Sequence, residues 1–445
     1  MQSLFFFIVA LAILIVIHEY GHFWVARRCG VKVLRFSVGF GKPLWSKTAA
    51  DGTEYVLAPI PLGGYVKMLD EREGDVASAD LERAFNRQSL SKRVAIVAAG
   101  PIANLLFAVF AYWLLFVAGI PGIKPVISEV IPASVAETAG FMPGDEIQEI
   151  NGRQTPIWNA VYKSLLREAE QGGNAQITVL SGGTLVEHRV HVPQIGIDET
   201  QDMLTKLGLV PLRPMLAPVI GDIVAGEPAD KAGLQPGDRL LSADGVMIDN
   251  WQAWVELIQQ HPEQELEVAV QREEHTHLLT LIPASGPDGI GRIGVAVDMS
   301  YTQVPEEMQS KLQFNMLTAT KEAVIQTWLF SASTLESLWG MLNGTVSTEN
   351  LGGPISIAQI AGSSAEQGWI SFVSFLAMIS ITLGILNLLP IPMLDGGHLA
   401  MFMIEAVRGK PLSEQTQIKG QQIGFILLAM LMFFAFFNDL SRLFG

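Results

Sequence analysis

The sequence predicts a polytopic α-helical membrane protein with four transmembrane helices, a pair of inserted α+β domains and a membrane-associated β-hairpin. Hydrophobic residues make up 49% of the 445 residues, and the mean hydropathy is +0.33. Four apolar runs are candidates to span a bilayer, which takes about 20 residues in a helix. A long acidic segment between the second and third runs contains an internal repeat.

The predicted membrane helices are residues 4–28, Val94–Gly119, Ile370–Leu389 and Ile423–Phe437. The first imitates a signal peptide, but no Lys or Arg precedes it and no convincing cleavage site follows, so we expect it to be retained. Basic residues gather between the first two helices and in the short loop after the third, at Arg408, Lys410 and Lys419. The positive-inside rule therefore places these segments in the cytoplasm and the acidic insertion outside.

Composition excludes two classes of chemistry. The net charge of −15 argues against a nucleic-acid partner. The single cysteine, Cys29, excludes an intrachain disulfide and a cysteine-rich metal site. Cys29 follows Arg27 and Arg28 at the end of the first apolar run, and we interpret it as a passive thiol at the membrane edge.

The first apolar run contains His18-Glu19-Tyr20-Gly21-His22. On a helix, His18 and His22 share one face and can both reach one zinc ion. Glu19 lies one step round the helix and can take a proton from an attacking water without being a ligand. The alternative is a soluble amphipathic helix with two surface histidines, but the run has no polar face to support it. Ionisable groups at membrane depth favour the metal site.

The third apolar run ends in a second polar motif. Pro390 and Pro392 cannot continue the helix, and extended backbone at membrane depth is tolerated only where protein or a polar cavity surrounds it. Asp395 follows in a turn flanked by glycine. Since catalytic zinc typically has three protein ligands and one open position, we predict Asp395 as the third ligand. His398 and Glu405 are the alternatives.

Asn387 lies about two helical turns before Asp395. Its amide can donate a hydrogen bond to a substrate carbonyl or an oxyanion. Alternatively, it satisfies the backbone groups that the proline break leaves free. The sequence predicts the first role but leaves the second open.

The segment after the first helix predicts a β-hairpin. Residues 31–40 and 54–68 look like short strands, and Gly39-Phe40-Gly41 is a turn or bulge signal. The hairpin is either an ordinary surface element or an edge that pairs with an extended substrate, because strand addition recognises backbone.

The acidic insertion contains the pattern Ala-Gly-(Phe/Leu)-x-Pro-Gly-Asp twice, at residues 139–145 and 232–238. Each copy is followed by an Asx-Gly turn six residues after its Asp. The pattern resembles PDZ domains over residues 120–220 and 221–308, which implies α+β folds built on a partly open β-barrel. Such domains bind extended chain ends by strand addition, or here act as spacers or a steric gate.

The two membrane motifs together with the repeats resemble the site-2 protease family of intramembrane zinc metalloproteases, over essentially the whole chain. The resemblance implies one catalytic Zn²⁺ and Glu19 as the catalytic base. The implied zinc ligands are His18, His22 and Asp395. The implied substrate-binding residues are Asn387, Pro390 and Pro392, with Gly39 and Gly41 in the membrane-associated β element.

The resemblance also implies the partners and the location. The expected substrate is a single-pass transmembrane protein already trimmed outside, such as an anti-sigma factor, with remnant signal peptides as a second class. The expected location is the bacterial inner membrane, with periplasmic PDZ domains and the zinc toward the cytoplasmic side. Two alternatives are a membrane-tethered PDZ scaffold without catalysis and a zinc transporter. The near absence of ionisable residues from the other helices disfavours transport.

The remaining insertion, residues 309–369, predicts an amphipathic helical connection that lies on the membrane interface or packs against the repeats. The predicted boundaries are 1–30 (first helix), 31–93 (cytoplasmic segment with the hairpin), 94–119 (second helix), 120–220 and 221–308 (PDZ-like domains), 309–369 (connection), 370–397 (third helix and turn) and 398–445 (cytoplasmic segment and fourth helix).

Overall fold

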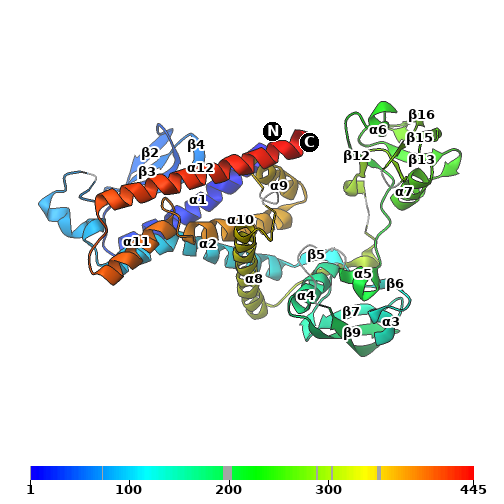
Figure 1. Ribbon diagram of the computed structural model, residues 1–445, viewed down its shortest axis with the longest axis horizontal. Coiled ribbons are helices and arrows are strands. Elements are labelled where there is room, and N and C mark those ends of the chain that lie inside the picture. Colours follow the sequence, from blue (N-terminus) through cyan, green and yellow to red (C-terminus); the bar gives the residue numbers. More distant parts are fainter. Residues whose placement is uncertain are drawn as a thin grey trace. The chain divides into compact units, whose positions relative to one another are not determined.

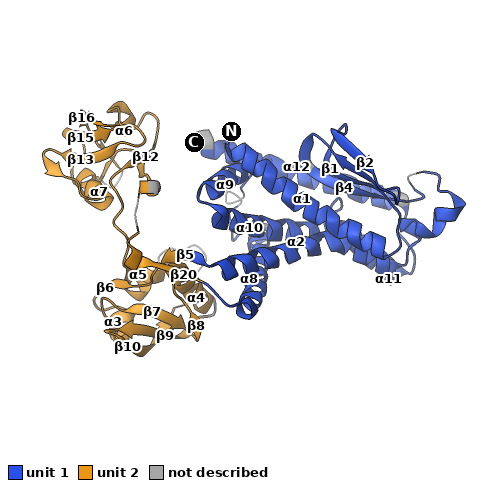
Figure 2. Ribbon diagram, turned by 180° about the vertical axis from the view of Figure 1, so that it is seen from behind, with its two compact units in different colours: residues 1–120, 313–445 blue, residues 121–312 orange. Residues whose placement is uncertain are grey.

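The structure, a computed structural model, describes residues 2–72, 74–193, 203–286, 289–301, 304–347 and 352–444. It divides into two compact units, Met1–Ile120 with Gln313–Gly445 and Pro121–Leu312 (Figure 2). The first unit contains the apolar runs, and the second contains the sequence repeat.

Among the described residues, four helices are long and apolar enough to cross a membrane. They are α1 (Gln2–Arg28), α2 (Leu90–Ala118), α10 (Trp369–Leu388) and α12 (Glu414–Phe444). Helix α2 is central to the unit and packs against both α1 and α10 (Figure 1). Helix α12 is longer than the apolar run that predicted it, because the polar residues on both sides of the run continue the helix.

Three further helices of this unit are α8 (Met316–Asn343), α9 (Pro354–Glu366) and α11 (Asp395–Arg408). Helix α8 packs on α2 and α10, where Phe330 and Leu338 join an apolar cluster, while Trp328 and Trp339 stay exposed. Helix α9 packs on α1 and α10, and α11 packs on α2. The predicted amphipathic connection, residues 309–369, therefore contains two helices, α8 and α9, that pack on the apolar helices of this unit.

The segment predicted as a hairpin forms a four-stranded sheet instead. Its strands are β1 (Val33–Phe40), β2 (Trp45–Thr48), β3 (Glu54–Leu57) and β4 (Ile60–Met68), in the order β2-β3-β1-β4. Strand β1 is antiparallel to β4 but parallel to β3, so the predicted single strand 54–68 is two strands on opposite sides of β1. The edge strand β4 packs against α1.

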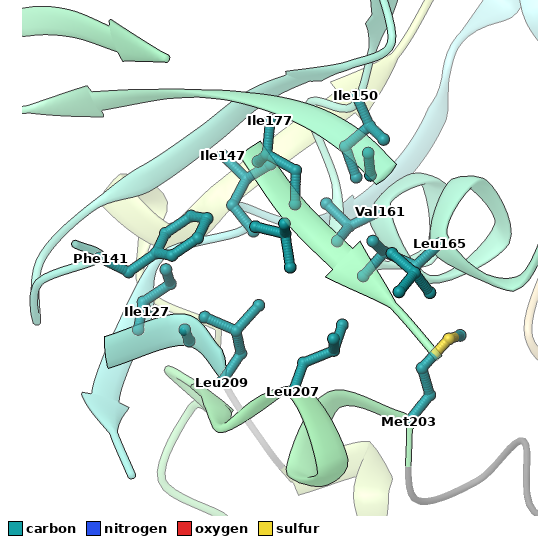
Figure 3. Close-up of a cluster of buried hydrophobic side chains, with 14 of the residues drawn as sticks. Ile127, Phe141, Ile147, Ile150, Val161, Leu165, Ile177, Met203, Leu207 and Leu209 are labelled. Atoms are coloured by element: carbon teal, nitrogen blue, oxygen red, sulfur yellow. The ribbon is translucent and has the colours of Figure 1, made fainter. Parts of the chain in front are cut away.

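In the second unit, the first repeat folds around one apolar core, in which Val161 and Leu165 of a helix meet Ile147 and Ile177 of the sheet (Figure 3). The antiparallel sheet has the order β10-β9-β7-β8, and β11 pairs separately with β6. The elements are β6 (Ile127–Val130), α3 (Val135–Ala139), β7 (Glu146–Ile150), β8 (Arg153–Gln154), α4 (Trp158–Gln171), β9 (Gly173–Ser181), β10 (Thr184–Val192), α5 (Met203–Leu207) and β11 (Leu209–Pro211).

The second repeat has the same plan, with a sheet of order β14-β13-β15-β16 and one helix between its second and third strands in sequence. Its elements are β12 (Ile220–Ile223), α6 (Pro228–Lys231), β13 (Arg239–Ala243), β14 (Val246–Met247), α7 (Trp251–Gln260), β15 (Leu266–Arg272), β16 (His275–Leu281), β17 (Ala284–Ser285), β18 (Gly291–Arg292) and β19 (Val295–Val297). Strands β5 (Ile120–Ile123) and β20 (Gln309–Leu312) pair with each other. In the described parts of both repeats the sheets are small and none closes, so the predicted partly open barrel is not confirmed.

The repeated motifs form the same turns in both copies. Asp145 accepts a hydrogen bond from the backbone N–H of Met142, and Asp238 accepts one from Gln235. Asn151 and Asp244 begin two-residue hairpin loops with φ of 49° and 47°, each followed by a glycine that also has positive φ. Positive φ at both loop positions is what an Asx-Gly pair supplies in this type of hairpin.

Candidate metal centre

Helix α1 brings two imidazoles to one face. The helix is continuous through the motif, so His18 and His22 lie one turn apart, and their Nε2 atoms are 3.3 Å from each other. His22 is buried, and His18 is half-buried. Both rings therefore present a potential ligand atom to the same point.

Asp395, the first residue of α11, completes the group. Its Oδ2 lies 3.2 Å from Nε2 of His18 and 3.3 Å from Nε2 of His22. This oxygen is buried and has no hydrogen-bond partner among the described residues. The three ligand atoms all lie within 4.8 Å of one another, and two imidazoles with one carboxylate are a ligand set that zinc accepts.

Helix α2 orients His22. Nδ1 of His22 donates a hydrogen bond of 2.8 Å to the backbone carbonyl of Ile96, which lies on α2. In the neutral ring this leaves Nε2 of His22 without a proton. Gly100 lies beside the same ring, and a Cβ at this position would stand 2.3 Å from Nε2 of His22. A glycine is therefore required for the two helices to approach this closely.

Helix α2 also contacts His18, through Asn104. The Asn104 side chain is buried, and its Nδ2 lies 3.4 Å from Nδ1 of His18. Metal-bound histidines usually donate from the second ring nitrogen to such a neighbour, and the amide of Asn104 can accept this bond because its Oδ1 is unpaired and exchanges with Nδ2 when the amide turns over. The contact leaves Nε2 of His18 directed at the cluster.

The turn before Asp395 has little freedom. After α10 ends at Leu388, the chain passes through Pro390 and Pro392, and Met393 adopts a φ of 120°, which is rare for a residue with a side chain. A Cβ at Gly396 would lie 2.1 Å from the Leu389 carbonyl oxygen. The turn packs so tightly on the end of α10 that the position of Asp395 is fixed.

Glu19 lies against the edge strand β4 of the sheet. A Cβ at Gly64 of β4 would lie 2.9 Å from Cγ of Glu19, so glycine at this position lets the strand pass directly over the glutamate. The side chain of Glu19 is half-buried, one residue along α1 from His18. The Glu19 carboxylate can thus act on a reacting group that is bound between the ligand group and strand β4.

The other predicted substrate-binding residues surround this centre without belonging to the ligand group. Asn387 is half-buried in the last turn of α10, and Pro390 is exposed in the following turn. Gly39 has a φ of 89° at a register shift between β1 and β4, as the bulge signal predicted, and Gly41 follows the end of β1 with a φ of 107°. The structure shows no hydrogen bond from these residues to the cluster among its described residues.

The two alternative third ligands take other roles. Glu405 forms an ion pair with Arg93 of α2, at 2.6 Å between Oε1 and Nη2. His398 lies on the first turn of α11 after Asp395 and is not part of the converging group in the described residues. Asp395 is thus the carboxylate that the fold presents to both histidines.

The sequence alone did not identify the residues of α2 that support the histidines. Asn104 was visible as the only strongly polar side chain in the second apolar run. Gly100 and the Ile96 carbonyl gave no signal, because their roles depend on how α2 packs against α1.

The fold and the site together indicate a multi-pass membrane protein with a candidate metal site formed by α1 and the start of α11. The chain belongs to Peptidase family M50, whose family model matches residues 6–431. It is 45% identical to Protease RseP of Yersinia pestis, over 99% of both chains. It is 44% identical to the Regulator of sigma-E protease RseP of Escherichia coli, over 98% of both chains, and 45% identical to a Putative zinc metalloprotease of Vibrio cholerae, also over 98% of both.

This membership confirms the predicted class. The chain is a zinc metalloprotease of the site-2 type, zinc is its cofactor, and it is a multi-pass protein of the inner membrane.

Proposed function

We propose that His18, His22 and Asp395 hold the catalytic zinc and that Glu19 is the general base in the hydrolysis of a peptide bond within the membrane. The convergence of Nε2 of His18 and Nε2 of His22 on Oδ2 of Asp395 carries this proposal. Bound at this point, zinc supplies a Lewis acid that activates water and polarises the scissile carbonyl.

The surrounding residues supply the remaining steps. Glu19 accepts a proton from the attacking water and delivers it to the leaving amine. A single carboxylate beside the ligand group is enough for both proton transfers. Ile96 and Asn104 hold the imidazoles in place throughout. Asn387 donates its amide to the substrate carbonyl from the end of α10, where Pro390 and Pro392 keep the backbone extended.

The substrate reaches the site as an extended segment. A helical peptide bond has its carbonyl hydrogen-bonded, so a transmembrane substrate must unwind before attack. We propose that the unwound segment adds to the free edge of β4, next to Glu19, with the bulge at Gly39 and Gly41 shaping the sheet. Cysteines placed along β4 should cross-link to a substrate cysteine near the scissile bond. A failure of every β4 position to cross-link would exclude this edge.

The proposed substrates are single-pass membrane proteins that another protease has already shortened outside, namely anti-sigma factors and remnant signal peptides. Relatives named regulators of sigma-E protease support the first class. The basic segment Arg27–Arg93 favours a cytoplasmic location for the sheet and for the nearby metal centre, with the two repeats in the periplasm.

The repeats are proposed to be PDZ domains that gate access by the size of the outer part of the substrate. Two features support the assignment as PDZ domains. The strands and the helix follow the same order in both copies, and the Asx-Gly loops match. A scaffold without catalysis would need the repeats but not the metal cluster.

The test of the proposed function is cleavage of a trimmed single-pass substrate in membranes by the wild type and by Glu19→Gln, with zinc measured in both. The variant should keep its zinc and lose cleavage by about 10²-fold or more, because it removes the proton acceptor but no ligand. Equal cleavage by the two proteins would show that Glu19 is not the base.

A further inference from the structure

A single turn of α2 contacts both α1 and α11 at the metal centre. The Ile96 carbonyl accepts the hydrogen bond from His22. Three residues earlier on the same helix, Arg93 reaches α11, the helix that begins with Asp395. Residues three apart on a helix share a face, so two of the three proposed ligands depend on one patch of α2.

The contact between Arg93 and α11 is bidentate and mostly removed from solvent. Nη2 donates to Oε1 of Glu405 at 2.6 Å, and Nη1 donates to Oε2 at 3.1 Å. The side chains are 15% and 16% exposed, and the guanidinium lies 5.0 Å from the ring centre of Phe402. A planar two-bond contact fixes direction as well as distance, which a single ion pair in water does not.

The arginine is also anchored to its own helix. Its Nε donates to the backbone carbonyl of Gln88 at 3.2 Å, so the guanidinium uses donors on both its sides. The long Arg93 side chain therefore has little freedom to follow a movement of Glu405.

Helix α11 is fixed at both ends by this arrangement. The tight turn around Gly396 holds its start, and the ion pair holds a point ten residues further on, about 15 Å along the axis. Asp395, Phe402 and Glu405 are spaced so that all three project toward one side of the helix. Without the second attachment, the helix can pivot about the turn and carry the Asp395 carboxylate away from the two imidazoles.

We propose that Arg93 and Glu405 are positioning residues that hold α11 in the orientation in which Asp395 completes the metal site. This inference rests on the proposed ligand set. It gives Glu405, an alternative zinc ligand by sequence, an indirect role in zinc binding. Loss of an outer partner of a metal ligand typically weakens metal binding by about 10–100-fold.

The test uses the full-length protein in detergent and measures zinc affinity by competition with a chromophoric chelator, alongside thermal unfolding. Arg93→Glu and Glu405→Arg should each weaken zinc binding by about tenfold or more. The double variant Arg93→Glu/Glu405→Arg restores the opposite charges and should recover most of the affinity. Arg87→Glu breaks an exposed bidentate pair with Glu71 in the same segment and should leave zinc binding unchanged.

The outcomes separate the two proposals. Asp395→Asn removes a ligand, and wild-type zinc affinity in this variant would contradict the metal site itself. If Asp395→Asn loses zinc but the Arg93 and Glu405 variants bind it normally, or if the double variant recovers nothing, the positioning role is wrong. Should the charge reversals fail to fold, Glu405→Gln keeps an acceptor for Arg93 but loses the charge. It should weaken zinc binding by several-fold, and an unchanged affinity would overturn the inference.

Discussion

Gly100 places a steric constraint on the metal centre at the scale of single residues. A Cβ at Gly100 would stand 2.3 Å from Nε2 of His22 and 2.8 Å from Cε1 of His18, well inside contact distance. Alanine is a better helix former than glycine, so the substitution does not weaken α2 by itself. Its effect falls on the two imidazoles.

We therefore predict that Gly100→Ala lowers zinc affinity by about tenfold or more, with a parallel loss of cleavage, because the rings can no longer converge on Asp395. Metal content after dialysis against a chelator measures the effect. The matched control is Gly420→Ala in α12, where the nearest atom to an added Cβ lies 3.8 Å away. Equal loss of zinc from both variants would mean that helix stability, not ring position, is responsible.

The residues of the site differ in how far the sequence predicted them. The spacing of His18 and His22 requires only a continuous helix, which the apolar run supplies, so this pair was predictable. Asp395 was predictable as one of three candidates, and the fold selects it by directing Glu405 to Arg93. The residues of α2 that contact the histidines were not predictable. These contacts join segments about 80 residues apart, as in His22 with Ile96 and His18 with Asn104.

At the scale of elements, a carboxylate of α12 caps the start of α9. Asp439 is buried near the end of α12 and accepts hydrogen bonds from the backbone N–H groups of Gly353 at 3.0 Å and Ile355 at 2.8 Å, and from the Ser356 side chain. These groups are the unpaired donors at the start of α9, so one helix caps another. Hydrogen bonds to a charged group contribute about 1.5–3 kcal/mol each.

We predict that Asp439→Ala lowers the unfolding temperature in detergent by several degrees, because it leaves the start of α9 without acceptors. Differential scanning fluorimetry of the full-length protein measures this. Gln422→Ala, at an exposed position of the same helix, is the control and should unfold like the wild type. An unchanged unfolding temperature for Asp439→Ala would show that the cap adds nothing to stability.

The elements also show where sequence patterns lose information. The four apolar runs predicted the four candidate membrane helices of the described residues, since length and hydrophobicity decide a membrane helix. The predicted hairpin became a four-stranded sheet, because the parallel pairing of β1 with β3 is not encoded in any local turn. The exposed strand β2 has no alternating apolar pattern from which a strand could be predicted.

At the scale of the whole molecule, the proposed division of labour between the two units can be tested directly. Each unit has its own apolar cores, so removing residues 125–305 leaves the membrane unit with its metal centre. If the repeats exclude substrates with an intact outer domain, the deletion should allow cleavage of an untrimmed single-pass substrate that the full-length protein leaves intact. Immunoblotting of membranes that contain both proteins measures this.

The same deletion with Glu19→Gln is the control for background proteolysis. An untrimmed substrate that stays resistant, while a trimmed one is cleaved, would contradict the gating role. The repeats themselves were predictable from sequence because each motif is local, whereas their small separate sheets depend on how the strands assemble.

The most direct measurement is the zinc content and coordination of the purified protein, by elemental analysis and X-ray absorption. We predict one zinc per chain, with two imidazole nitrogens and one carboxylate oxygen at about 2.0–2.2 Å. His22→Ala and Asp395→Asn should each abolish this signal. A full equivalent of zinc with unchanged coordination in both variants would place the metal elsewhere and contradict the proposed metal site.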